Sequence, residues 1–186
     1  MNTFHIIIKS RNSVTAFGGY NHKIFFLQLL NSTIFKYKGS LHAFVIMDTH
    51  AHLLVTVHNT SLFIKTLLSR YARIYNKWNN KQGALFQNGA IIYQKQYNSW
   101  KIDTILYILN NPIEARICKC HKDYHFSSYK LHTGQKTSLA NIIVIDNRLI
   151  EENFMDITQF KEALKDKLKY QKSVAHIKYN RSNCHN

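Results

Sequence analysis

The order of six apolar segments in the first half of the chain limits its fold more than any other feature. Short apolar runs predict strands, and apolar residues spaced three and four apart predict helices. The predicted strands are residues 4–9, 41–47, 52–57 and 90–97, and the predicted helices are residues 20–37 and 61–78. The order strand-helix-strand-strand-helix-strand is that of the ferredoxin-like, split β-α-β fold. We therefore predict an α+β sandwich, in which helices pack on one face of an antiparallel sheet and leave the other face free.

A further helix is predicted over residues 98–112, after the fourth strand. Ser99 is a suitable N-cap residue, and apolar residues follow it at helical spacing. Pro112 is the only proline in the chain and is expected to mark the end of this helix. The segment around Asp123-Tyr124 and Ser127-Ser128 is interpreted as a structural clamp that follows the helix.

Residues 131–186 form a C-terminal helical extension to a domain that spans residues 1–130. This extension contains a short apolar run at 139–146 and a helix that is capped at Asp156 and ends near Tyr170. The tail after Tyr170 has little to bury and is predicted to be mobile.

Positive charge is the dominant property of the composition. The chain has 186 residues with 25 Lys and Arg against 10 Asp and Glu, a formal charge of +15, and residues 1–130 hold +12 of it. The chain also has 11 tyrosines and 11 phenylalanines. A basic surface with aromatic rings suits a phosphate backbone with exposed bases, which favours a nucleic acid as the partner over a surface that only confers solubility.

Membrane and secreted classes are not indicated by the sequence. No run approaches the roughly 18 continuous apolar residues of a membrane span, and the first residues do not resemble a signal peptide. The three cysteines, Cys118, Cys120 and Cys184, are an odd number and give no disulfide framework. We therefore expect a soluble cytoplasmic protein with reduced thiols.

Two histidines interrupt the apolar strand in VIMDTHAHLLVTV, residues 45–57. Side chains alternate along a strand, so His50 and His52 lie on one face and Ala51 on the other. Two neighbouring imidazoles can bind one divalent cation and leave its other positions open. The alternative is that the pair only packs or forms hydrogen bonds across strands.

Tyr107, in the helix of residues 98–112, is a candidate nucleophile. A phenol with a pKa near 10 attacks phosphorus only if its proton is removed and the charge on the phosphoryl oxygens is stabilised. A cation held by His50 and His52 could provide that stabilisation. Asn111 follows Tyr107 by one helical turn, and its amide oxygen could complete the coordination of the cation.

Five stretches of the sequence resemble, in order, the landmarks of a known family. They are HAFVIMDTHAHLLVTV, Tyr75-Asn76, GALFQ at 83–87, ILYILNNPIEARIC, and DYHFSSYK. Over about residues 4–130 the chain is similar to the REP-associated tyrosine transposases, a branch of the single-tyrosine HUH transposases. Asp48-Thr49 departs from the Pro-Asn of the family pattern, and the Asp48 carboxylate is a further candidate neighbour of the cation.

The resemblance implies a metal-dependent DNA transposase. His50 and His52 would be the metal pair for Mg²⁺ or Mn²⁺, with Asn111 as a further ligand. Tyr107 would cleave single-stranded DNA, leaving a 5′-phosphotyrosine link and a free 3′-hydroxyl that can reverse the step. The expected partner is single-stranded DNA, including DNA that folds into a hairpin.

Four basic residues on and after the helix of residues 61–78 are candidate DNA contacts. They are Arg70, Arg73, Lys77 and Lys81, and the alternative is an ordinary solvated helix face. Relatives can act as monomers or as dimers that exchange the tyrosine helix. The short connection between the fourth strand and Tyr107 favours the monomer.

Other interpretations stay open at the level of sequence. Tyr71 and Tyr75 are rival tyrosines, although their apolar neighbours favour a place in the core. A cluster of Cys118, Cys120, His121 and His125 invites a zinc site, but its spacing is not that of a common one. A nucleic-acid-binding protein that keeps the scaffold without cleaving is the alternative function, and a nuclease of the replication or conjugation branch is a third possibility.

Overall fold

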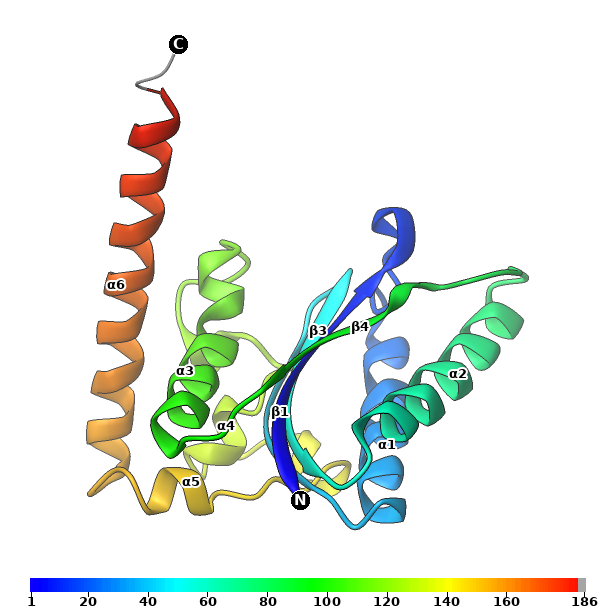
Figure 1. Ribbon diagram of the computed structural model, residues 1–186, viewed down its shortest axis with the longest axis horizontal. Helices are drawn as coiled ribbons and strands as arrows, with labels where there is room; N and C mark the ends of the chain where they lie inside the picture. Colours follow the sequence, from blue (N-terminus) through cyan, green and yellow to red (C-terminus); the bar gives the residue numbers. More distant parts are fainter. Residues whose placement is uncertain (184–186) are drawn as a thin grey trace.

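The computed structural model contains a four-stranded antiparallel sheet with the strand order β2-β3-β1-β4 (Figure 1). It describes the backbone of residues 1–183 and the side chains of residues 1–87 and 89–171. The strands are β1 (Asn2–Ser10), β2 (Ser40–Ile46), β3 (His50–Val57) and β4 (Phe86–Gln94). With α1 (Tyr20–Lys36) after β1 and α2 (Thr60–Trp78) after β3, this is the predicted ferredoxin-like sandwich.

The helices α1 and α2 cover one face of the sheet, and the larger core lies beneath them (Figure 1). Alternate residues of the central strands point into this core because successive side chains of a strand face opposite ways. Fully buried members include Ile6, Ile8, Phe26, Leu27, Leu30, Phe44, Leu53, Val55, Phe63, Leu67 and Tyr71. This core fixes the sheet on which the histidines stand.

The opposite face of the sheet is not free, which corrects the prediction. The helix α3 (Asn98–Glu114) packs across β2 and β3, and α4 (Tyr129–His132), α5 (Arg148–Glu151) and α6 (Ile157–Asn183) pack around it (Figure 1). Their second core contains Val45, Leu54, Ile105, Ile108, Leu109, Leu149, Phe160 and Leu164. Because β2 is apolar on both faces, it is covered on both, and the C-terminal extension belongs to this cover. The boundary near residue 130 stays a prediction.

The helix α3 differs from the prediction at both ends. It begins at Asn98 after the cap position Tyr97, so Ser99 lies inside the first turn. It also continues through Pro112 to Glu114. A proline lacks the backbone donor but keeps its carbonyl, and the carbonyls of Asn111 and Pro112 still accept from Ala115 and Ile117.

The helix α6 begins as predicted and ends later. Its first turn is capped by Asp156, whose Oδ1 accepts hydrogen bonds from the backbone N–H groups of Thr158 and Gln159. The helix continues to Asn183 instead of ending near Tyr170, and residues 171–183 contain neither glycine nor proline to stop it. The last three residues of the predicted mobile tail, 184–186, lie outside the described residues.

The segment after α3 extends the sheet at the outer edge of β2. The backbone N–H of Ile46 donates to the carbonyl of Phe126, and the backbone N–H of Ser128 donates to the carbonyl of Phe44. The Tyr124 hydroxyl donates to the Ile46 carbonyl at 2.6 Å. These contacts confirm the predicted structural clamp.

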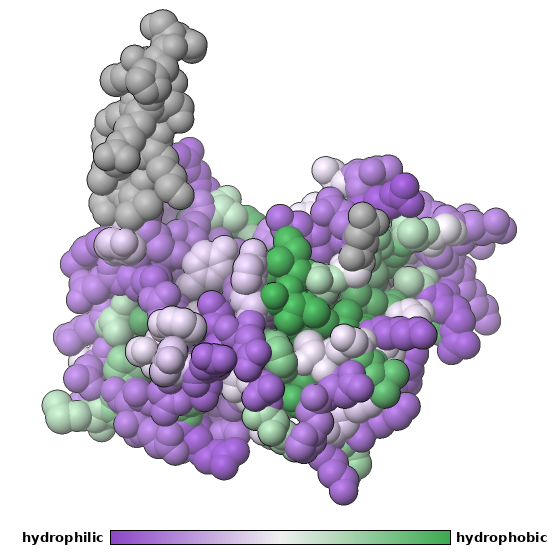
Figure 2. All heavy atoms as spheres, in the orientation of Figure 1, coloured by the Kyte–Doolittle hydropathy of each residue, from purple (hydrophilic) through white to green (hydrophobic). Residues whose placement is uncertain are grey.

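The surface around β4 is the exposed end of the sheet. Figure 2 shows an apolar strip among hydrophilic side chains on the face where β4 crosses the view of Figure 1. Ile91 and Ile92 of β4 are 44% and 40% exposed.

In the described part of the chain, no helix has the combined length and apolarity needed to cross a bilayer.

Candidate active site

A cavity of about 420 Å³ lies where α3 crosses the histidine-bearing face of the sheet. It is lined by Ile7, Lys9, Ser10, Ser13, Thr49, His50, His52, Gln87, Tyr107 and Asn111. The cavity therefore brings together all four of the residues that sequence analysis assigned to catalysis and metal binding. All four belong to one chain.

The two histidines lie side by side on β3, as strand alternation predicts. Their ring centroids are 5.3 Å apart, with the ring planes at 81°. The half-buried Tyr107 closes the cavity from α3, with its ring centroid 5.6 Å from that of His52. Asn111 donates from Nδ2 to the carbonyl of Tyr107 at 3.1 Å, and its side chain is also hydrogen-bonded to that of His50.

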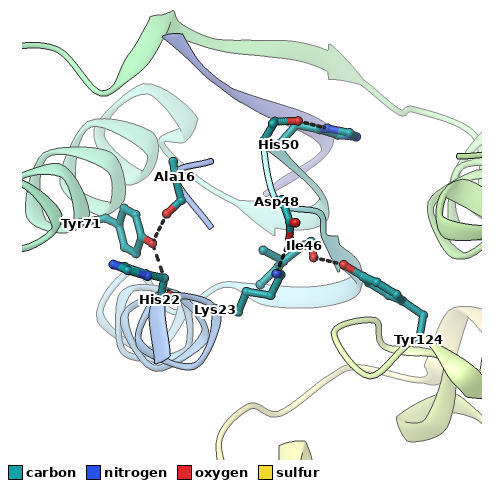
Figure 3. A network of polar contacts seen from close by, with 9 residues as sticks. Ala16, His22, Lys23, Ile46, Asp48, His50, Tyr71 and Tyr124 are labelled. Atoms are coloured by element: carbon teal, nitrogen blue, oxygen red, sulfur yellow. Dashed lines mark hydrogen bonds and ion pairs between the residues drawn. The ribbon is translucent and has the colours of Figure 1, made fainter. Parts of the chain in front are cut away.

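The turn before His50 is anchored from two neighbouring segments, and Figure 3 shows one of these contacts, between Lys23 and Asp48. Ser10 donates from its backbone N–H and its Oγ to the Thr49 carbonyl, and Phe17 donates to the Asp48 carbonyl. The buried Lys23 of α1 forms an ion pair with Asp48 at 2.5 Å. The Asp48 carboxylate is therefore engaged with Lys23, and it does not line the cavity as the proposed neighbour of a cation would.

Sequence analysis missed a third histidine, His5 of β1, beneath the pair. Its Nε2 lies 3.0 Å from Nδ1 of His52, and the two rings stack with centroids 5.3 Å apart. The Tyr107 ring meets the His5 ring edge-on at 5.8 Å. The available signal was a histidine in the apolar strand FHIIIK, which is the same signal that identified His50 and His52.

Two further polar residues of the cavity were not assigned to the site. Lys9 lies directly opposite His50 in the register of β1 and β3, and it is the one lysine or arginine among the lining residues. Gln87 ends the GALFQ stretch of the resemblance. Both also line an adjoining cavity of about 190 Å³ that continues along β4 past Ala90 and Ile91.

Burial keeps the histidines of the site uncharged at neutral pH. Loss of water lowers the pKa of His52 to about 3 and that of His5 to about 4, and it lowers the pKa of His50 as well. The positive charge of Lys9 adds to the lowering at His50 and His52. A neutral imidazole keeps a lone pair on one nitrogen, which is the form that binds metals.

The hydrogen bonds of the pair fit a divalent cation. His50 uses Nδ1 toward the Thr49 hydroxyl at 3.2 Å, and His52 uses Nδ1 toward His5. Metal-binding histidines commonly engage one ring nitrogen in this way and bind with the other, here Nε2. Among the described residues, no three His, Cys, Asp or Glu side chains are grouped for a metal. The groups in the cavity that could serve as ligands to a cation are thus the two imidazoles and the Asn111 amide.

The four predicted DNA contacts lie apart from this cavity. Arg70, Arg73 and Lys77 are exposed on α2, which covers the other face of the sheet, and Lys81 is exposed in the loop that follows. None of them lines the cavity. Their contact with DNA stays a prediction.

The rival tyrosines lie in the larger core, on the other side of the sheet. Tyr71 is fully buried and donates from its hydroxyl to the Ala16 carbonyl at 2.7 Å (Figure 3), and Tyr75 is 4% exposed. Burial raises the pKa of Tyr71 far above its usual range. Neither hydroxyl is placed to reach a substrate in the cavity.

The residues of the proposed zinc cluster have separate partners. His121 Nε2 lies 2.6 Å from Oδ1 of Asn110, and Cys120 donates to Asp123. His125 stacks on Tyr20. These contacts give Cys120, His121 and His125 structural roles around the segment after α3.

One solved structure shares the fold, and a second was found at a lower TM-score. A solved structure of a REP-associated tyrosine transposase bound to a REP hairpin aligns with a TM-score of 0.60 at 13% identity, over 78% of this chain and 87% of that one. A protein of Deinococcus radiodurans R1, described as a candidate transposase, aligns with a TM-score of 0.44 at 15% identity, over 62% and 87%. No curated protein matches the chain in sequence.

A protein-family model gives the assignment. The model described as "Transposase IS200 like" matches residues 2–110, more than half of the chain. The matched region runs from β1 through most of α3 and includes His5, His50, His52 and Tyr107. The chain therefore belongs to the family of IS200-like transposases, in agreement with the resemblance found in its sequence.

Proposed function

We propose that this transposase cleaves and rejoins single-stranded DNA through a covalent link to Tyr107, with the help of a divalent cation. The observation that carries the proposal is the cavity in which Tyr107 faces the His50 and His52 pair. A tyrosine that served only the core would have its hydroxyl buried with a partner, as Tyr71 has.

The proposed step exchanges one phosphodiester for another. Tyr107 Oη attacks phosphorus, the P–Oη bond forms, and the bond from phosphorus to the 3′ oxygen breaks. The phenolic proton is lost, the departing 3′ oxygen gains a proton, and the phosphate stays on the 5′ side as phosphotyrosine. Attack by the 3′-hydroxyl reverses the step, which permits transfer to a new strand.

The residues around Tyr107 suit this reaction. His50, His52 and Asn111 would hold Mg²⁺ or Mn²⁺, which when bound supplies positive charge for the phosphoryl oxygens. Lys9 lines both this cavity and the adjoining one and adds a positive charge there. A phosphate in the site would therefore meet positive charge from the β1 side as well.

Single-stranded DNA that includes a hairpin is the proposed substrate. The charge of +15 supports a nucleic-acid partner, and the solved relative was bound to a REP hairpin. The adjoining cavity along β4 offers a path for the strand away from the scissile phosphate. Because the tyrosine and both histidines of one chain share one cavity, we propose that a monomer carries a complete site.

The test is covalent capture of DNA. Purified protein is incubated with labelled single-stranded DNA from both flanks of its gene, with Mg²⁺ or Mn²⁺, and a denaturing gel is scored for a protein–DNA band. We expect a band that disappears with EDTA, with His50→Ala and with Tyr107→Phe. Tyr71→Phe is the matched control, because it removes a tyrosine hydroxyl outside the cavity, and it should keep the band.

Two results would contradict the proposal. A band that persists in Tyr107→Phe would move the nucleophile elsewhere. Salt-sensitive binding without any band, on DNA from both flanks, would favour the alternative of a nucleic-acid-binding protein that does not cleave.

A further inference from the structure

His5 is placed to control the orientation of one member of the histidine pair. It lies next to His52 across the β1–β3 ladder, where Ile7 is directly opposite His52 and His5 is its diagonal neighbour. The contact between His5 Nε2 and His52 Nδ1 is a buried hydrogen bond of 3.0 Å. His5 is 6% exposed and His52 is 4% exposed, so water does not compete readily for either atom.

The packing around His5 holds its ring in place. The His52 ring stacks on it at an interplanar angle of 27°, and the Tyr107 ring meets it edge-on at 70°. Tyr93, its direct partner on β4, lies on another side with ring centroids 6.2 Å apart. A ring enclosed by three aromatic neighbours cannot turn away without disturbing the packing of the site.

The hydrogen bond couples the tautomers of the two rings. Each neutral imidazole carries one proton, on Nδ1 or on Nε2, and a hydrogen bond needs one N–H and one lone pair. If His5 donates, the proton of His52 must be on Nε2, which removes the lone pair that a cation would use. If His5 accepts, His52 carries its proton on Nδ1 and presents a bare Nε2.

We infer that His5 is a positioning residue, which accepts the hydrogen bond from His52 Nδ1–H and so fixes the His52 tautomer that binds the cation. The inference rests on the proposed function, because it assigns the cation to His50 and His52. The Nδ1 partner of His50 is of a different kind, because the Thr49 hydroxyl can either donate or accept. The position of the proton on His52 is thus set from a strand that carries neither of the paired histidines.

The first test reads the tautomers directly. Long-range ¹H–¹⁵N spectra of the imidazoles in the full-length, metal-free protein distinguish Nδ1–H from Nε2–H, and single substitutions assign the signals. We expect Nδ1–H for both His5 and His52. An Nε2–H signal for His52 would overturn the inference, and this measurement needs no variant to bind metal.

The second test compares Mn²⁺ affinity among variants, from the electron paramagnetic resonance signal of free Mn²⁺. His5→Phe keeps a ring without an acceptor and should weaken binding about 10- to 100-fold, the usual loss when such an outer partner is removed. His5→Gln places an amide oxygen near the position of Nε2 and should recover most of the affinity.

The matched control is His42→Phe. His42 is also buried, and its Nε2 lies 2.7 Å from the Thr56 hydroxyl. Neither residue lines the cavity. This variant should leave Mn²⁺ affinity unchanged. Equal affinity of His5→Phe and wild type overturns the role of His5 and leaves the cleavage proposal intact. A wild type that forms no adduct and binds no Mn²⁺ overturns the cleavage proposal, together with the cation that His5 would serve.

Discussion

Replacing Asp48 with asparagine should destabilise the protein more than replacing its partner, Lys23, with methionine. The lysine side chain is 7% exposed and the aspartate side chain is 59% exposed, so the two ends of this ion pair differ in their access to water. Asp48→Asn leaves a buried ammonium without its counter-charge. Lys23→Met removes the buried charge and leaves a carboxylate that water can solvate.

The distance in the structure sets the magnitude. At 2.5 Å, two unit charges attract by roughly 7 kcal/mol at an effective dielectric constant of 20 and by roughly 2 kcal/mol in bulk water. The exposed carboxylate places the pair near the lower value. We therefore expect a loss of about 2 kcal/mol for Asp48→Asn. Lys23→Met should lose about 1 kcal/mol or less, chiefly through the lost contact of the ammonium with the Phe126 ring.

Urea unfolding followed by circular dichroism measures both losses, provided that the slope against denaturant is unchanged. In a chain of this size, the loss for Asp48→Asn corresponds to about 4–8 °C in Tm. The double variant should be close to Lys23→Met alone, since the charge that Asp48 compensates is then absent. A Lys23→Met loss equal to or greater than that of Asp48→Asn would refute the reasoning.

Two further predictions concern other buried polar groups. Burial lowers the pKa of His132 from 6.5 to about 4, so the unfolded chain binds this proton first as the pH falls. Between pH 7 and pH 4 the free energy of unfolding should therefore fall by about 3 kcal/mol because of this residue. Over the same pH range, urea unfolding of His132→Gln should show a loss of stability that is smaller than that of the wild type by about 3 kcal/mol, and an equal loss would contradict the assignment. Substitutions at the neighbouring residues Asn110 and Asn111 should have different effects, on stability and on DNA cleavage respectively. Asn110 is fully buried and links α3 to His121 and to Leu164 of α6, so Asn110→Ala should cost about 2–3 kcal/mol. Asn111→Ala should instead lower adduct formation at nearly unchanged Tm, and the reverse pattern would exchange their roles.

Local rules predicted the centre of the site. His50 and His52 share a face because strands alternate, and Asn111 follows Tyr107 by one helical turn. Both relations depend only on neighbours in the sequence, and both are present in the cavity. The same rules identified the four strands and the first two helices.

Long-range relations account for what sequence analysis missed. His5 and Lys9 join the site through the pairing of β1 with β3, whose partners are more than 40 residues apart in sequence. The prediction of a free face was wrong because α3 packs across β2 and β3, and the apolar residues of α5 and α6, far along the chain, complete the core around it. Periodicity also does not say which face of the sheet a helix covers, so the sequence alone could not place the basic residues of α2 relative to the cavity, and their contact with DNA stays a prediction.

The central place of β1 in the sheet has a consequence for synthesis of the protein. β1 leaves the ribosome well before its neighbours β3 and β4 and the helix with Tyr107. At roughly 5–20 residues per second, the segment from β1 to Asn111 takes on the order of 5–20 s to appear. During that interval the nascent chain lacks the cavity in which we propose that DNA is cut. A fragment released before α3 is complete should therefore form no covalent adduct with DNA.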